Sequence, residues 1–372
     1  MKTIVIKKED LRHNINKIKE HAMTNENDDN GNSVKIIAVV KGNGYGLGLI
    51  QYVKFLMDEG IDFFAVATVE EALKIREAGI KNRVLMLSSI AIKEDVKKLV
   101  EQNVIITLGS EDAVKVAEEV ASELNTEVKA HLKIDTGFGR YGFRYENREK
   151  MVEVLKNAKN IKIEGTFTHF SMAFYDEKYT KLQFNRFIDC IEVLKMNEIN
   201  PGMLHVCNSS AFIRFPNMHL NAVRIGSAFL GRLTIPNTLG LKRIGYLESQ
   251  VSEIKDLPKG SFIGYGNTYK SKKDMKIAII PCGYMDGVNM QVGKDMFRFI
   301  DKARYLFGDL KSLFKKQSLT VEVAGKICNI VGTVGTYHVA VDITNKQINV
   351  GDIAIFKLYP GYVDSSITRE YR

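Results

Sequence analysis

The sequence has 372 residues, of which 45% are hydrophobic and 26% charged, as in globular proteins and unlike disordered or fibrous chains. Its charge of +9 is spread along the chain without a long basic block, so it indicates no nucleic-acid partner. No apolar run approaches the roughly 20 residues of a membrane span, and Met1–Lys7 is too short for a signal peptide. The four cysteines form no CxxC pair, which favours reduced thiols in the cytoplasm.

Short apolar segments alternate with amphipathic, helix-like segments over the first part of the chain. Eight segments have the composition of β-strands: 35–41, 63–68, 83–88, 104–109, 128–135, 163–170, 203–208 and 222–229. Apolar strands separated by helices are typical of a parallel sheet that is covered on both faces. Eight such units predict a (β/α)8 TIM-type barrel over residues 11–235. A doubly wound open sheet is the alternative, but KGNGYG after the first strand does not supply its GxGxxG turn.

The pattern changes after Gly231, where short strand candidates are separated by Gly, Pro, Asn and Asp. These candidates are 247–254, 275–281, 319–324, 332–334, 339–343 and 353–358. They predict a mainly β C-terminal domain over 236–372, which residues 1–10 are expected to join as a strand. Lys294–Lys316 interrupts this domain with helical periodicity, and we interpret it as an amphipathic surface helix or as a lid or partner-binding element. The polar stretch Thr24–Ser33 predicts a loop.

Reactive groups in a barrel of this type lie at the C-terminal ends of the strands. Lys41 closes the first strand, where partial desolvation would favour its neutral amine and Schiff-base formation, although a lysine that reaches solvent has the same pattern. Ser209, Gly226 and Ser227 follow the last two strands, where this fold binds phosphate, and Tyr45 could donate from the opposite side. Unless these are ordinary turn residues, the set predicts a phosphorylated aldehyde cofactor held at both ends.

Other charged side chains at strand ends are candidates for the same site. Arg224 and His205 are placed to face the barrel interior or mouth, and a buried arginine needs partners such as His205. Arg140 could hold a carboxylate or phenolate, or could form a structural ion pair with Asp135. His169 by itself fits a core histidine at least as well as a catalyst.

Several motifs in chain order give a more specific indication. They are AVVKGNGYG (38–46), LKIDTGFGRYG (132–142), GTFTHF (165–170), HVCNSSA (205–211), VRIGSAFLG (223–231), IGYGNTY (263–269) and CGYMDG (282–287). In combination they resemble the alanine racemases, a barrel-type family that depends on pyridoxal 5'-phosphate (PLP), over about residues 1–290. The resemblance implies a homodimeric isomerase with shared active sites that interconverts L- and D-alanine, with PLP and without a metal. It implies a small amino acid as substrate and neither a nucleic-acid nor a membrane partner.

The resemblance implies a two-base mechanism. Lys41 would carry the Schiff base and act as one base, and Tyr265 of the partner subunit would act as the other on the opposite face of the substrate. His169 would assist Tyr265 through a hydrogen bond, so that the phenol works below its ordinary pKa of about 10. Lys133 matches a position that can be carbamylated, and the added carboxylate would orient Arg140.

The resemblance also implies which residues hold the ligands. Arg224, backed by His205, would face the pyridine nitrogen and keep it unprotonated, which disfavours transamination. The implied cofactor contacts are Lys41, Tyr45, His169, His205, Ser209, Arg224, Gly226 and Ser227. The implied substrate contacts are Arg140, Asn329 and Tyr284.

The chain departs from the family pattern at several positions. Leu47 and Leu230 replace a usual His and Tyr, and Cys328-Asn329-Ile330 stands where Cys-Met-Asp is usual. The helical insertion lengthens the stretch before Gly325, and the usual helix near the C-terminus is missing, with Tyr362 a weak substitute for a gating tyrosine.

Because of these departures, serine or another amino acid is an alternative to alanine as the substrate. A non-catalytic, PLP-binding regulatory protein is a second alternative, although the presence of both Lys41 and Tyr265 disfavours it. A related barrel decarboxylase would need a Cys-Asp motif and a glycine-rich phosphate loop, and the sequence has neither.

Overall fold

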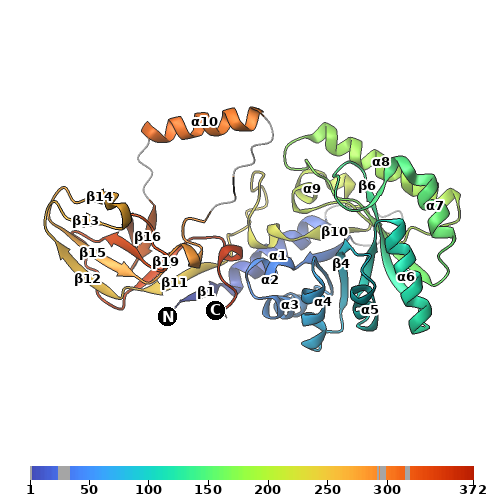
Figure 1. Ribbon diagram of the computed structural model, residues 1–372, viewed down its shortest axis with the longest axis horizontal. Helices are drawn as coiled ribbons and strands as arrows, with labels where there is room; N and C mark the ends of the chain where they lie inside the picture. Colours follow the sequence, from blue (N-terminus) through green and yellow to red (C-terminus); the bar gives the residue numbers. More distant parts are fainter. Residues whose placement is uncertain (1, 24–33, 291–292, 294–298, 315–318) are drawn as a thin grey trace. The chain divides into compact units, whose positions relative to one another are not determined.

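The computed structural model describes residues 2–23, 34–290, 293, 299–314 and 319–372 (Figure 1). The chain divides into two compact units. The first is Lys8–Ile244, and the second combines Met1–Lys7 with Gly245–Arg372. The predicted loop at 24–33 and the ends of the predicted insertion helix, 294–298 and 315–316, lie outside the described residues.

Within the described residues of the first unit, eight parallel strands close into a barrel. They pair in the order β2-β3-β4-β5-β6-β8-β9-β10, and β10 pairs with β2. The strands are β2 (Lys35–Val39), β3 (Phe63–Val66), β4 (Arg83–Ser89), β5 (Ile105–Leu108), β6 (Val128–Asp135), β8 (Ile161–Phe167), β9 (Met203–His205) and β10 (Ala222–Ile225). The short β7 (Phe143–Arg144) pairs with the end of β6. The predicted TIM-type barrel is confirmed, and the open-sheet alternative is wrong because the sheet closes.

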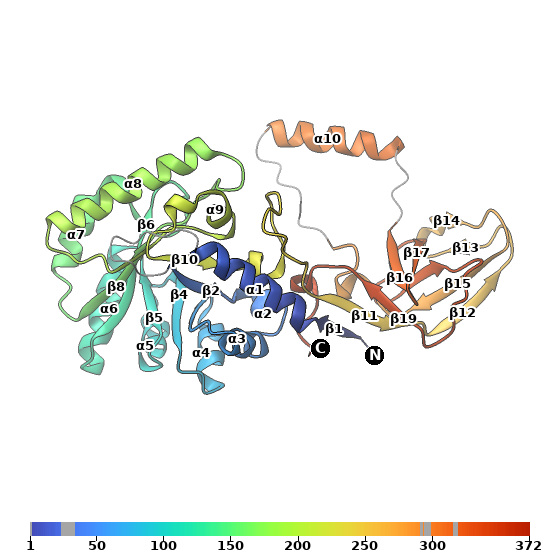
Figure 2. The same ribbon diagram turned by 180° about the vertical axis from the view of Figure 1, so that it is seen from behind.

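Helices surround the barrel, as Figures 1 and 2 show from opposite sides. They are α1 (Lys8–Met23), α2 (Lys41–Tyr45), α3 (Leu49–Asp58), α4 (Val69–Glu77), α5 (Lys93–Glu101), α6 (Glu111–Leu124), α7 (Arg148–Lys156), α8 (Glu177–Met196) and α9 (Ser209–Arg214). The side chains of Thr68, Ser110 and Asp176 begin α4, α6 and α8 by accepting hydrogen bonds from first-turn N–H groups. No helix among the described residues is both long and apolar enough to cross a membrane.

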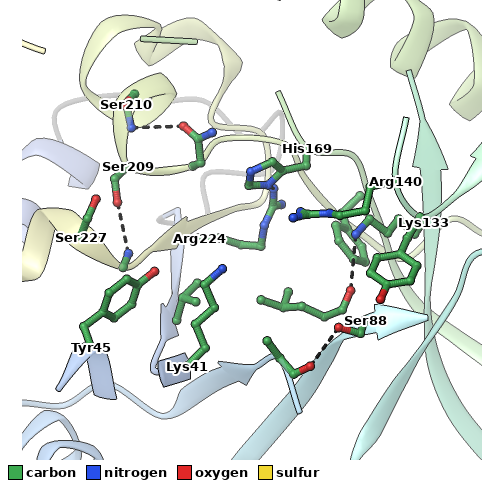
Figure 3. A pocket seen from close by; sticks show the side chains of 17 residues that line it. Lys41, Tyr45, Ser88, Lys133, Arg140, His169, Ser209, Ser210, Arg224 and Ser227 are labelled. Carbon is green, nitrogen blue, oxygen red and sulfur yellow. Dashed lines mark hydrogen bonds between the residues drawn. The ribbon is translucent and has the colours of Figure 1, made fainter. Parts of the chain in front are cut away.

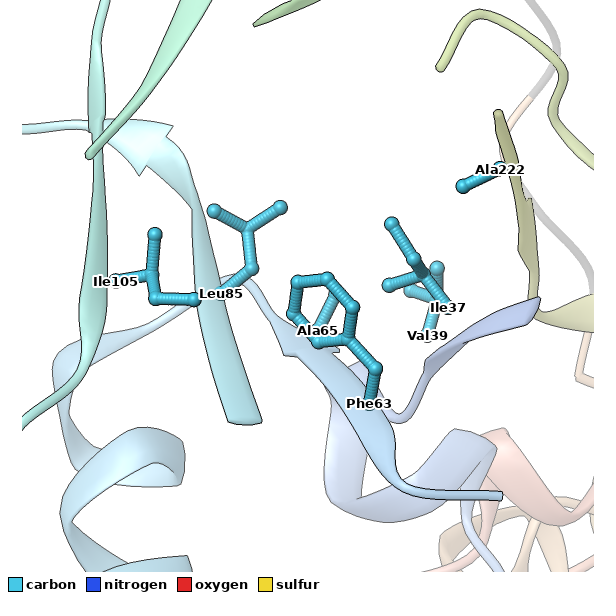
Figure 4. Close-up of a cluster of buried hydrophobic side chains, with 7 residues drawn as sticks. All are labelled: Ile37, Val39, Phe63, Ala65, Leu85, Ile105 and Ala222. Atoms are coloured by element: carbon cyan, nitrogen blue, oxygen red, sulfur yellow. The ribbon is translucent and has the colours of Figure 1, made fainter. Parts of the chain in front are cut away.

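Side chains from alternate strand positions fill the barrel. A buried apolar cluster joins four neighbouring strands and β10, and its members are Ile37, Val39, Phe63, Ala65, Leu85, Ile105 and Ala222 (Figure 4). On β6 the same alternation places His131 and Lys133 on one face, because side chains two residues apart on a strand point the same way. His131 contacts His205 of β9, so this face of β6 is turned toward the barrel interior.

The second unit is a nine-stranded sheet in the described residues, with the order β12-β15-β18-β17-β16-β19-β11-β1-β20. Its strands are β1 (Thr3–Ile6), β11 (Tyr246–Gln250), β12 (Glu253–Leu257), β15 (Met275–Ile280), β16 (Thr320–Val323), β17 (Lys326–Val331), β18 (Val339–Asp342), β19 (Ile353–Phe356) and β20 (Thr368–Tyr371). A separate hairpin pairs β13 (Phe262–Ile263) with β14 (Tyr269–Lys270). β1 pairs antiparallel with β11 and parallel with β20.

The separate, mainly β second unit agrees with the predicted fold class, but some strand positions were wrong. The predicted strand at 332–334 is a turn that begins at Gly332, whose φ of 75° few other residues adopt. The strand lies just before it, at β17, and β20 was not predicted at all. The insertion contains the predicted helix as α10 (Phe299–Phe314), and Tyr362 ends a short 3-10 turn that begins at Pro360.

Candidate active site

A cavity of about 300 Å³ opens at the C-terminal ends of the barrel strands (Figure 3). It brings together nine of the predicted site residues: Lys41, Tyr45, Lys133, Arg140, His169, Ser209, Arg224, Gly226 and Ser227. Four of these are basic, and none of the described residues that line the cavity is a carboxylate. Its surroundings therefore favour an anionic ligand.

Lys41 reaches the cavity from the first residue of α2. Gly42, Asn43 and Gly44 after it all have left-handed backbone angles, so the chain turns away sharply and leaves Lys41 at the strand end. Burial lowers the pKa of the Lys41 amine, and the charge of Arg140 adds to this, while Glu71 opposes it. The neutral, nucleophilic form of the amine is therefore more accessible than that of an exposed lysine.

Three hydroxyl groups, from Tyr45, Ser209 and Ser227, gather at one side of the cavity (Figure 3). Ser209 Oγ accepts hydrogen bonds from the backbone N–H groups of Gly226 (3.2 Å) and Ala228 (3.3 Å). With both of its acceptor positions used, the hydroxyl keeps its proton for a further acceptor. Glycine at position 226 leaves room for Tyr45, because a Cβ there would collide with the Tyr45 hydroxyl and would displace it. Ser227 completes a set of hydroxyls suited to phosphate oxygens (Figure 3).

Arg224 is the most deeply buried cation of the site, with 3% of its surface exposed. Its guanidinium donates to His205 Nδ1 (2.8 Å) and to the carbonyl oxygens of His205 (2.7 Å), Thr168 (2.7 Å) and Val206 (3.1 Å). Burial lowers the pKa of Arg224 to about 10, which still leaves it protonated at neutral pH. The site thus holds a charged arginine that is hydrogen-bonded to uncharged groups.

Lys133 is a second buried amine, with 4% of its surface exposed. Its Nζ donates to the carbonyl oxygen of Leu87 at 3.4 Å and lies 5.1 Å from the ring centre of Phe167. Burial, together with the charges of Arg224 and Arg140, lowers the pKa of Lys133 to about 7. Near neutral pH much of this amine is uncharged and able to react with an electrophile.

Arg140 and His169 both line the same cavity, and both contact the ring of Phe138. The Arg140 guanidinium lies 4.5 Å from the Phe138 ring centre, and the His169 ring meets Phe138 edge-on at 5.3 Å. Burial and the charge of Arg224 hold the pKa of His169 well below its ordinary value, so its imidazole is neutral. The alternative role of Arg140, pairing with Asp135, falls instead to Arg144 at 3.7 Å.

The remaining three predicted residues lie on the second unit. Tyr265 is 80% exposed and lines a groove with Phe262 and Tyr337, and its carbonyl oxygen accepts from Thr333 Oγ1 at 3.2 Å. The hydroxyl of Tyr284 accepts from Thr336 Oγ1 (3.0 Å), another residue of that groove.

Asn329 is not among the residues that line this groove. It lies on β17, where it pairs with Thr320 and Asp342 of the two neighbouring strands. Leu47 and Leu230, the two departures in the barrel unit, are fully buried and do not line the cavity. The predicted site residues are therefore gathered only in part.

Sequence reasoning missed several residues of the site. Tyr141 lines the cavity directly after Arg140, and Glu71 holds the loop after Lys41 by accepting from the backbone N–H of Asn43 at 3.1 Å. His131 contacts His205 behind Arg224 at 2.8 Å. A usable signal existed for His131, which precedes Lys133 by two residues on one strand and so shares its face. Nothing local in the sequence indicates Glu71.

The residues of the cavity fit PLP. A phosphorylated aldehyde needs hydroxyl donors for its phosphate, positive charge around it and a lysine that can lose its proton, and the cavity supplies all three. In the described part of the chain, no three His, Cys, Asp or Glu side chains cluster as a metal site would require.

Comparison with known proteins identifies the family. A family model for the alanine racemase N-terminal domain matches residues 6–233, and one for the C-terminal domain matches residues 244–360. An alanine racemase of Carboxydothermus hydrogenoformans is 35% identical over 93% of this chain and 87% of its own length. One of Methanococcus maripaludis is 32% identical over 86% and 81%. The crystal structure of alanine racemase from E. faecalis matches with a TM-score of 0.82 at 28% identity, covering 100% of this chain and 98% of that chain. The chain belongs to the alanine racemase family.

Proposed function

We propose that this protein is a PLP-dependent isomerase that interconverts L- and D-alanine. The observation that carries the proposal is the barrel cavity, in which a lysine of lowered pKa faces phosphate-type hydroxyl donors among four basic side chains. The family to which the chain belongs uses the same cofactor. Alanine is the favoured substrate because the relatives that match most of the chain are named alanine racemases.

The cavity residues divide the work of holding the cofactor. The hydroxyls of Tyr45, Ser209 and Ser227 would bind the phosphate, and Arg224 would face the ring nitrogen. When bound, PLP withdraws electrons from the substrate α-carbon and so acidifies its C–H bond. Arg224 is a donor with a fixed charge, so it opposes protonation of the ring nitrogen and limits this electron withdrawal to what racemisation needs.

Lys41 is our proposed base on one face of the substrate. Its Nζ would hold the cofactor aldehyde until substrate binds and would then take a proton from, or return one to, the α-carbon. The lowered pKa supports both roles, because each requires an unprotonated amine.

Tyr265 of the partner subunit is our proposed base on the opposite face. Its 80% exposure on the second unit supports this, because a catalytic phenol needs a protein surface to cover it and exclude water. The neutral His169 imidazole would accept a hydrogen bond and help the phenol to exchange its proton. Two bases on opposite faces are what inversion at the α-carbon requires.

Substrate recognition would use residues of both units. We assign the substrate carboxylate to Arg140, with Tyr284 and the backbone of Asn329 as further contacts. Lys133 is proposed to react with carbon dioxide, forming an N–C bond and releasing one proton, so that the resulting carbamate orients Arg140. The low pKa of the Lys133 amine and the lack of carboxylates among the described lining residues both support this assignment.

We further propose a homodimer with shared active sites, located in the cytoplasm. The groove at Tyr265 supports the dimer, since it exposes Phe262 and Tyr337 as well as the phenol itself. The four cysteines support a reducing compartment, because all are buried and free in the described chain.

The decisive experiment uses the PLP-loaded protein with L-alanine, and in parallel L-serine, in deuterium oxide. Proton NMR follows exchange at the α-carbon, and chiral chromatography follows the D isomer. Both signals are expected with alanine, and Lys41→Ala should abolish both. Tyr265→Phe should slow formation of the D isomer by roughly 100-fold or more, as expected for loss of an acid–base group.

Tyr175→Phe is the matched control, because Tyr175 is a 76% exposed tyrosine of the barrel unit that is not among the residues that line the cavity. It should behave as wild type. If the protein racemises serine but not alanine, serine replaces alanine as the proposed substrate. Binding of PLP without exchange for either amino acid would overturn the proposed function and favour the regulatory alternative.

A further inference from the structure

A chain of hydrogen bonds leads from Arg224 into the barrel interior. Arg224 Nη1 lies 2.8 Å from His205 Nδ1, and His205 Nε2 lies 2.8 Å from His131 Nδ1. All three side chains are buried, with 3%, 0% and 0% of their surfaces exposed. The first member belongs to the proposed cofactor site, and the last does not line that cavity.

Arg224 fixes the tautomers of both histidines in this chain of hydrogen bonds. A guanidinium is donor-only, so His205 Nδ1 must be unprotonated in order to accept from it. Neutral His205 then carries its proton on Nε2 and donates it to His131 Nδ1. His131 must in turn carry its own proton on Nε2. Every donor in the chain thus points away from Arg224.

The surroundings hold both imidazoles in place and keep them neutral. The His205 ring stacks on Phe167 with ring centres 4.8 Å apart and planes within 9°. Gly165 makes room for His131, because a Cβ there would lie 2.7 Å from its ring. The charges that face the pair are Arg224 and Lys133 on one side and Arg83 on the other, and Arg83 is paired with Glu164 at 3.1 Å.

His131 has no other use in the fold that would explain a polar residue. Its Nε2 is buried and has no hydrogen-bond partner among the residues that the structure describes, and its ring lies edge-on to Phe63 at 6.0 Å. Burying an unsatisfied donor of this kind destabilises the folded protein. An apolar residue would fill this position at lower cost, so the retained imidazole indicates a role for its other nitrogen.

We propose that His131 is a positioning residue for Arg224. By accepting the Nε2 proton of His205, it holds His205 in the one tautomer that presents a lone pair to the guanidinium. Without that acceptor, His205 would carry an unsatisfied donor and would gain from turning or from moving its proton to Nδ1. Arg224 would then lose an in-plane acceptor and its fixed direction. The expected effect on the cofactor rests on the proposed function, whereas the predicted tautomers of His205 and His131 do not depend on it.

The first test measures the tautomers directly, in cofactor-free protein labelled with 15N-histidine. Long-range 1H–15N NMR should show both His205 and His131 protonated on Nε2 only, unchanged around the ordinary histidine pKa of roughly 6.5. In His131→Leu, His205 should show an Nδ1-protonated population or begin to titrate. His131→Asn should restore the wild-type signal of His205, because the Asn carbonyl oxygen can occupy the place of Nδ1.

The second test follows reaction specificity in the PLP-loaded enzyme. The measured quantity is the rate of transamination divided by the rate of racemisation. In transamination, alanine leaves its amino group on the cofactor and departs as pyruvate. His131→Leu should raise this ratio at least tenfold, and His131→Asn should return it to within about threefold of wild type. Phe63→Leu is the control for packing, since it alters the neighbour of His131 without touching the hydrogen bonds, and it should leave the ratio unchanged.

An Nδ1 proton on His205 in the wild type would overturn the proposal without any variant. So would an unaltered His205 signal in a folded His131→Leu protein, or an equal rise of the ratio in Phe63→Leu. If the wild type racemises neither alanine nor serine, the proposed function fails, and the tautomer measurements alone decide the positioning role of His131.

Discussion

At the scale of single residues, the site contains two buried amines with different neighbours. Lys41 lies near Glu71, whose charge partly counters the effect of burial. Lys133 lies near Arg224 and Arg140, whose charges Asp135 partly counters. Lys133 is therefore the less stable of the two as a cation. Its folded-state pKa of about 7 is lower than the 10.5 of an ordinary lysine.

This difference makes the stability contribution of Lys133 depend on pH. Between about pH 7 and 10.5 the unfolded chain binds a proton at this residue and the folded protein does not, so stability rises with pH across that window. In carbon-dioxide-free buffer, the cofactor-free Lys133→Met variant should be more stable than wild type at pH 7. The difference in the free energy of unfolding between the two proteins should narrow by up to about 1.4 kcal/mol per pH unit toward pH 10.

Urea unfolding followed by circular dichroism measures this gap. Added bicarbonate should stabilise the wild type but not Lys133→Met, since only a lysine can form the carbamate. A gap that stays constant with pH would contradict the lowered pKa.

Gly226 gives a second prediction at this scale. An added Cβ would collide with the Tyr45 hydroxyl, so Gly226→Ala must displace Tyr45 or shift the backbone that Ser209 binds. The affinity for PLP, measured by fluorescence titration, should fall at least tenfold. Gly308→Ala is the matched control, because a Cβ at that position meets nothing within 4 Å. Equal affinities in the two variants would argue against the phosphate cradle.

At the scale of elements, apolar segments located the barrel strands well because several of them, such as β3 and β5, are buried along their whole length. It failed in the second unit where burial does not follow composition. Ile327 on β17 is apolar but exposed, so the strand lacks the expected alternation. Val331 and Val334 flank the turn at Gly332, and their apolar character led to the wrong strand prediction there. β20 consists of Thr, Arg, Glu and Tyr and owes its strand state to pairing with β1.

The helix α10 shows what periodicity can and cannot predict. The spacing of Phe299, Leu306, Phe307 and Leu310 predicted an amphipathic helix, but these apolar side chains are the exposed ones and Asp301 is buried. A repeat in the sequence defines a face and does not specify which face finds a partner.

A stability comparison follows from this exposure. Phe307 is 70% exposed, so Phe307→Ser should change the free energy of unfolding by no more than about 0.5 kcal/mol. Phe64→Ala, at a fully buried barrel residue, should cost about 3–5 kcal/mol. Urea unfolding of both variants checks this. A large loss from Phe307→Ser would show that α10 packs its apolar face in solution.

At the scale of the whole molecule, the sequence indicated nine residues of the barrel cavity, including its four lysines and arginines, because strand ends converge at one rim. It indicated Tyr265 and Tyr284 only through family motifs, since nothing in strand order places residues of the second unit near those of the first. Asn329 shows the limit of such transfer, because it replaces the family residue and does not line the groove at Tyr265, although Val331 of the same strand does.

A mixing experiment tests whether active sites are shared between subunits. Lys41→Ala and Tyr265→Phe should each be inactive, yet a mixed dimer would contain one site with both native residues. After unfolding and refolding of equal amounts together, alanine racemisation should return to about one quarter of wild type, since half of the dimers are mixed and each has one intact site of two. No recovery, with mixed dimers verified by two different affinity tags, would place both bases in one chain.

The position of β1 between β11 and β20 sets an order of events during translation. The ribosome makes β1 first, and its neighbour β11 begins more than 240 residues later. At roughly 5–20 residues per second, β1 waits about 10–50 s for its first partner. All barrel strands lie within that interval, so the barrel can form while β1 is still single. The strand has only four residues and is bordered by Lys2, Lys7 and Lys8, which limits pairing with other nascent chains while it waits.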